Sequence, residues 1–130
     1  MTSATTEASK VALLLEIASK SVDFIERQQT RRIMQDALNG AYANWREDNS
    51  VHHRIEQDSD EWKMMMDATA SEYEDLSDAK REEANAAKRL RHAVFKYKKE
   101  IDAEKARDAG LEPADDKRVD LADMYSQFLP

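Results

Sequence analysis

The sequence contains no cysteine and, in 130 residues, only two glycines and two prolines. Without cysteine the chain can form neither a disulfide nor a thiolate metal site. So few glycines and prolines leave little material for the tight turns of a sheet protein, whereas helix interiors need neither residue. Charged residues make up 36% of the chain, a proportion typical of long helices. These features together predict an all-α protein.

Long apolar runs are also missing. No stretch approaches the ~20 consecutive apolar residues that cross a bilayer, and no basic region precedes the first apolar residues. The sequence therefore predicts no membrane span and no recognisable secretion signal. We expect a protein of the cytoplasm or of a virion.

Residues that could carry catalysis or hold a metal are few and poorly placed. His52 and His53 are neighbours, so they would not face each other on a helix, and His92 lies far along the chain. The acidic residues between 72 and 78 lack the Glu-x-x-His pairs of a di-metal helical bundle. There is no glycine-rich phosphate loop. The sequence therefore predicts a protein that is not an enzyme and that binds no metal and no cofactor.

The longest uninterrupted stretch is 58–108, which has no glycine and no proline. Asp58 and Ser59 both suit the N-cap of a helix, and Glu61 could complete a capping box with Asp58. Gly110 suits the left-handed residue just beyond a helix. This stretch predicts one long helix.

Residues on one face of this helix recur every seven positions, as in a coiled coil. Each row contains one polar exception, Lys80 in the first and Glu83 in the second, and alanines on either side widen the face. The two rows are Met66, Tyr73, Lys80, Ala87, Val94 and Ile101, and Trp62, Thr69, Leu76, Glu83, Leu90 and Tyr97.

A second amphipathic helix is predicted over about 9–46. Its apolar residues keep nearly the same phase past Thr30 and past Gly40, which favours one continuous helix over two shorter ones or a DNA-reading helix-turn-helix. The apolar face of its first half consists of Val11, Leu14, Leu15, Ala18, Val22 and Ile25, broadened by Leu13, Ile17 and Phe24.

The polar segment 47–57 is expected to be a turn, so that the helices form a long antiparallel hairpin with coiled-coil-like packing. If the turn is centred near His53, residues whose numbers sum to about 106 lie opposite one another, and Trp45 meets Trp62. The same register buries Leu90, Val94 and Tyr97 against Val11, Leu14 and Ala18, and it places Arg27, Arg31 and Arg32 beside Asp78, Asp75 and Glu74.

Positive charge is concentrated in the second helix. Residues 84–99 include no acidic residue, and the acids expected opposite them, Glu7 and Glu16, are too few to neutralise them. This basic block is predicted to bind phosphates or the acidic surface of a protein, with the protein favoured. Its members are Lys88, Arg89, Arg91, Lys96, Lys98 and Lys99.

The chain changes character after Gly110. We expect a helical domain over 1–110 and, over 111–130, a linker and a docking tail with a short amphipathic helix. The tail is too short to be stable alone, and its apolar residues would be exposed if it stayed free. We expect it to bind a protein partner through Tyr125, Phe128 and Leu129.

These features favour a non-enzymatic helical assembly or adaptor protein that forms a homo-oligomer and binds other proteins. The layout of helical hairpin, basic block and acidic tail resembles that of small phage packaging and assembly proteins, including small terminase subunits, in architecture and in no motif. A phage or virion component is thus one expectation. The alternatives are a nucleic-acid-binding packaging or regulatory factor that uses the basic block, and a small acidic helical inhibitor of a host enzyme.

Overall fold

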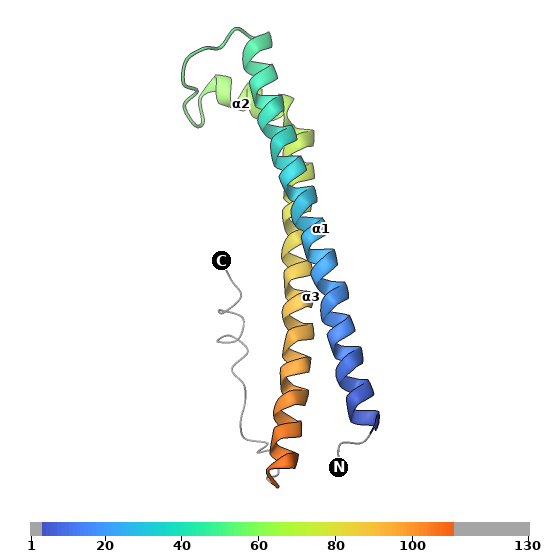
Figure 1. Ribbon diagram of the computed structural model, residues 1–130. Helices are drawn as coiled ribbons and strands as arrows, with labels where there is room; N and C mark the ends of the chain where they lie inside the picture. Colours follow the sequence, from blue (N-terminus) through green and yellow to red (C-terminus); the bar gives the residue numbers. More distant parts are fainter. Residues whose placement is uncertain (1–3, 111–130) are drawn as a thin grey trace. The chain divides into compact units, whose positions relative to one another are not determined.

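The structure, a computed structural model, describes residues 4–110, which contain three helices (Figure 1). In chain order they are α1 (Ala4–Asp48), α2 (Asp60–Ala68) and α3 (Ala70–Asp108). Residues 4–110 contain no strand. The protein is therefore all-α, as its scarcity of glycine and proline predicts.

α1 is one unbroken helix of 45 residues. It passes through Thr30, whose hydroxyl donates a hydrogen bond to the carbonyl oxygen of Glu26 at 3.1 Å, so this polar side chain is satisfied within the helix. It also passes through Gly40, where an added Cβ would meet nothing within 4 Å. The structure thus agrees with the continuous helix, and residues 9–46 do not form a helix-turn-helix.

The prediction of a single helix over 58–108 is wrong, because the helix is interrupted at Thr69. This residue has φ −111° and ψ 16°, and its hydroxyl donates to the carbonyl oxygen of Met65 at 2.7 Å. Thr69 is 2% exposed. A buried, β-branched threonine that returns a hydrogen bond to the preceding turn tends to bend a helix. The break therefore needs neither glycine nor proline.

The start of α2 also differs from the prediction. Asp58 has φ 65° and does not cap the helix. Ser59 does, because its Oγ accepts a hydrogen bond from the backbone N–H of Trp62 at 3.2 Å. The Glu61 carboxylate lies 2.9 Å from His53 Nε2. At the other end of the stretch, the left-handed conformation predicted for Gly110 is confirmed by its φ of 70°.

The chain divides into two compact units, which are described separately. Among the described residues, unit 1 comprises 4–24 and 86–110, and unit 2 comprises 25–85. In unit 1 the buried residues are Ala86 and Ala93. In unit 2 they are Leu38, Met65, Thr69, Leu76 and Ala79. Each unit pairs a segment of α1 with a segment of α3.

The residues of one of the two predicted rows are all at least partly buried. Thr69 and Leu76 are buried, and Glu83, Leu90 and Tyr97 are half-buried. The other row is shifted by one residue: α3 buries Ala79, Ala86 and Ala93, whereas Lys80 is exposed and Tyr73 is 55% exposed. Alanine allows a neighbouring helix to approach more closely than lysine or tyrosine does, and this favours the alanine row.

The predicted register is also wrong. In unit 2, Arg27 lies 3.5 Å from Glu82, and Arg31, which the predicted register places beside Asp75, forms an ion pair with Glu83. Because α3 begins only at Ala70, after α2, the partners of α1 have higher residue numbers than a turn centred at His53 would give. Trp45 and Trp62 are both half-buried in unit 2, and their mutual contact stays a prediction.

Candidate interaction surface

The basic block lies on α3 in unit 1, and part of it is engaged with α1. Arg89 Nη2 is 2.8 Å from Asp23 Oδ2, and Lys96 Nζ is 3.2 Å from Glu16 Oε1. Glu16 was expected opposite the block; Asp23 was not. Arg91 is half-buried, and Lys88, Lys98 and Lys99 are exposed. At least two members of the block, Arg89 and Lys96, therefore form ion pairs with α1 while their side chains remain partly exposed.

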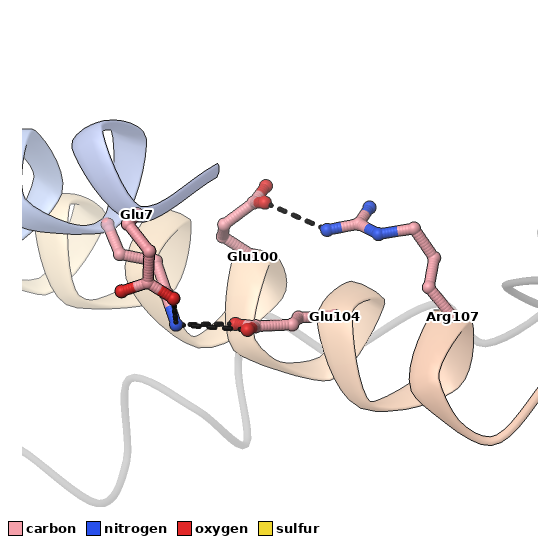
Figure 2. Close-up of polar contacts among 5 residues, drawn as sticks. Glu7, Glu100, Glu104 and Arg107 are labelled. Carbon is pink, nitrogen blue, oxygen red and sulfur yellow. Dashed lines mark hydrogen bonds and ion pairs between the residues drawn. The ribbon is translucent and has the colours of Figure 1, made fainter. Parts of the chain in front are cut away.

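A third connection between the two helices of unit 1 centres on Lys10 (Figure 2). Its Nζ lies 2.9 Å from an oxygen of Glu104 on α3 and 3.0 Å from Glu7 on α1. The Lys10 and Glu104 side chains are only 18% and 14% exposed. Hydrogen bonds to Glu104 first, and then to Glu7, raise the pKa of Lys10 against the opposing effect of desolvation. The Glu7 that was expected to face the basic block instead pairs with Lys10.

These three pairs fix the direction of the helices in unit 1. Along α1 the paired residues are Lys10, Glu16 and Asp23, and along α3 their partners are Glu104, Lys96 and Arg89. Residue numbers rise on one helix as they fall on the other, so the two segments are antiparallel. The charged side of α1 faces α3.

The apolar side of α1 is consequently exposed. Val11 is 54% exposed, Leu14 46%, Leu15 65% and Val22 59%. Ala18, between them, is also exposed. We call Val11, Leu14, Leu15, Ala18 and Val22 the outer stripe. The prediction that Leu90, Val94 and Tyr97 bury against Val11, Leu14 and Ala18 is wrong on the α1 side, although all three α3 residues are half-buried.

Within residues 8–22, the surface of the outer stripe exposes no charged side chain, and the exposed acids Glu7 and Glu26 lie at its two ends. From residue 8 to 22, the charged residues Lys10, Glu16 and Lys20 are all half-buried, whereas every exposed residue is uncharged. The exposed residues of this segment are Ala8, Ser9, Val11, Ala12, Leu14, Leu15, Ala18, Ser19 and Val22. A surface helix normally has its apolar face inward and its polar face outward. This part of α1 instead has apolar residues on its outward side as well, which is typical of an interaction surface.

Sequence reasoning found these apolar residues and assigned them to the wrong partner. Leu13, Ile17 and Phe24, described as broadening the face, are half-buried and belong to the side of α1 that faces α3. The signal in the sequence was charge. A single alignment of the two helices places Lys10, Glu16 and Asp23 each opposite a residue of opposite charge on α3. That register could not be chosen from α1 alone.

The predicted tail anchors remain predictions. Tyr125, Phe128 and Leu129 lie outside the described residues. Within the described part of the chain, no group of three or more acidic, histidine or cysteine side chains is placed to hold a metal ion. No helix there is long and apolar enough to cross a membrane. Comparison of the chain with protein-family models, with curated proteins and with solved structures finds no match.

Proposed function

We propose that this protein is a non-enzymatic helical assembly or adaptor protein that acts by binding other protein chains through its helix surfaces. In this proposal α1 and α3 form a long antiparallel hairpin with coiled-coil-like pairing, of the kind used in assembling particles such as virions. The observation that carries the proposal is the outer stripe, which places large apolar side chains on the side of α1 that faces away from α3.

The thinness of the unit 1 core supports the same function. Its fully buried residues are alanines, and no large side chain among the described residues is completely buried. Burying a whole Val or Leu side chain contributes about 1.5–3 kcal/mol, so four such side chains that are about half exposed leave roughly 4 kcal/mol unrealised. A protein partner that covers them would recover that free energy.

A site-specific crosslink tests the proposal. A photo-reactive phenylalanine analogue at position 15 lies in the outer stripe, whereas the same analogue at position 102, an exposed position on α3, is the control. In the cells that produce the protein, we expect position 15 to form a covalent adduct with a protein chain in much higher yield than position 102. Equal yields, or no protein adduct at position 15, would contradict the proposal.

The tail is the second surface in this proposal. Tyr125, Phe128 and Leu129 would supply the anchors, because aromatic and leucine side chains remove the most apolar area from water. Removing residues 111–130 should leave the helix content of the described residues intact and weaken partner binding. Unchanged partner binding would refute the role of the tail.

Nucleic-acid binding is the alternative function, and the exposure of Lys88 and Lys99 favours it. It is the weaker candidate because Arg89 and Lys96 already pair with Asp23 and Glu16. Phosphate contacts give a steep loss of affinity with salt. If this alternative is correct, duplex DNA should bind, and Lys88→Glu together with Lys99→Glu should reduce the salt slope by about two contacts. Binding that is absent or insensitive to salt would eliminate it.

A further inference from the structure

We infer that the outer stripe binds the outer stripe of a second copy of this chain, so that α1 packs on α1 across a two-fold axis. The inference deepens the proposed function by naming one partner, and it rests on that function. It concerns only the α1 segment of unit 1.

The spacing of the stripe is that of a helix–helix contact surface. Val11, Leu15, Ala18 and Val22 follow one another at intervals of four, three and four residues. This alternation keeps a row of side chains on one line along a helix and is the spacing of a coiled-coil seam. The partner that this spacing fits is another helix.

The absence of charge makes the surface compatible with itself. In a two-fold contact the same patch appears on both sides, so any exposed charge near the axis would meet its own copy. Residues 8–22 expose no charged side chain, and the three that they contain are half-buried on the α3 side. Within residues 8–22 a second copy therefore brings no exposed like charges together, and the exposed acids Glu7 and Glu26 lie at the ends of the contact.

Small residues allow the two helices to come close. Ala12 and Ser19 are exposed beside the stripe, and Ala18 is within it. The large side chains Leu14, Leu15 and Val22 can therefore pack over a neighbouring backbone. Since twelve residues of helix span only ~18 Å, the contact is at the small end of specific interfaces, and we expect a dimer whose population depends on concentration.

The tail is a less suitable occupant of this surface. Its apolar residues are accompanied by Asp115, Asp116, Asp120 and Asp123. The outer stripe offers no basic residue to any of these carboxylates, whereas the basic block does. Charge therefore favours a second copy over the tail on the stripe.

A disulfide crosslink tests the inference directly, because the chain has no cysteine of its own. Ala18 lies near the middle of the stripe, so it is close to its own copy whether the two helices run parallel or antiparallel. Ala18→Cys should give a disulfide-linked dimer under mild oxidation, since a disulfide needs Cα atoms within about 7 Å. Asp102→Cys, an exposed position on α3, should stay largely monomeric. Equal crosslinking of the two variants would overturn the inference.

Sedimentation gives the second readout on the protein without cysteine. The wild-type mass should rise from 14.9 kDa towards twice that value with concentration. Leu15→Glu should remain monomeric, and the matched control Ile33→Glu, at a similarly exposed position of α1 but outside the stripe, should dimerise as the wild type does. Equal loss of dimer in both variants, or a wild type that is always monomeric, would overturn the inference.

The crosslink at position 15 separates this inference from the proposed function. An adduct of twice the chain mass supports the second copy. An adduct with a different protein would overturn the inference and leave the proposed function standing. An internal adduct with the tail would also overturn the inference, and the proposed function would stand if another surface of the chain still bound a partner. No protein adduct would contradict both.

Discussion

Units 1 and 2 are both built by α1 and α3, yet they bury and expose different kinds of residue. Within the described residues, unit 1 has ten Lys and Arg against seven Asp and Glu, whereas unit 2 has eight against fifteen. Unit 2 buries Leu38, Met65 and Leu76, whereas unit 1 buries only alanines completely and exposes the outer stripe.

This difference indicates a division of labour along α1. In unit 2 the large apolar side chains of the two helices contribute to the fold. In unit 1, three ion pairs connect the helices and, among its described residues, only two alanines are buried, whereas the larger apolar residues are half-buried or, in the outer stripe, exposed. We therefore expect unit 2 to contribute more to stability, and the proposed function assigns partner binding to unit 1.

Truncating a buried leucine of unit 2 should have the largest effect on stability. Leu76 is 4% exposed, and Leu76→Ala removes its buried methyl groups and leaves a cavity. We expect the free energy of unfolding to fall by about 3 kcal/mol in urea denaturation followed by circular dichroism. If Leu76→Ala lowered the free energy of unfolding by less than Leu13→Ala in unit 1, unit 1 and not unit 2 would contribute more to stability.

Enlarging a buried alanine of unit 1 should have the next largest effect. Ala86 is 0% exposed, so Ala86→Leu forces α1 and α3 apart. The expected cost is about 2 kcal/mol, measured in the same denaturation experiment. Ala87→Leu, one position along on the same helix and only half-buried, is the matched control and should cost less. Equal costs would show that the alanine row is not the contact between the helices.

The Lys10 pair predicts a loss of stability at alkaline pH. Glu104 and Glu7 raise the pKa of Lys10 above its ordinary value of 10.5. Because the folded state holds this proton more tightly, the stabilisation is fully present below pH 10.5 and is lost as the pH rises through the raised pKa. Wild type should therefore lose more of its unfolding free energy above that pH than Glu104→Gln does. Equal losses of unfolding free energy in the two proteins would show that the Lys10–Glu104 pair does not stabilise the fold.

The exposed ion pair of unit 1 should have the smallest effect. Arg89 and Asp23 are 2.8 Å apart, with side chains 43% and 31% exposed. Solvent screens such a pair, and a double-mutant cycle of Arg89→Ala and Asp23→Ala should give a coupling of about 0.5 kcal/mol. Zero coupling would mean that this pair does not help to orient α1.

Much of the fold could be predicted from the sequence because local patterns determine it. The continuity of α1 follows from an apolar phase kept across Thr30 and Gly40, and the end of α3 follows from Gly110. The break at Thr69 could not be predicted, because threonine is tolerated in many helices and only its burial and its hydrogen bond to Met65 make it a bend. The predicted register was wrong for a related reason, because α2 lengthens the segment that connects α1 to α3.

The candidate surface could be predicted only in part. Apolar residues lie on two sides of α1, the outer stripe and the row of Leu13, Ile17 and Phe24, so periodicity alone does not decide which row faces α3. Pairing of Lys10, Glu16 and Asp23 with α3 decides it, and this pairing is a property of two segments far apart in sequence. The basic block was located correctly on α3, but its partial use by Glu16 and Asp23 depends on the same long-range register.

One comparison of two substitutions tests most directly whether the outer stripe is a surface. Leu15 and Leu38 are both on α1, and they are 65% and 3% exposed. In dilute protein, Leu15→Glu should leave the helix content unchanged and the free energy of unfolding within about 0.5 kcal/mol of wild type, whereas Leu38→Glu should abolish the folded state. If Leu15→Glu unfolds the protein as Leu38→Glu does, the outer stripe belongs to the core, and the interaction surface described above does not exist.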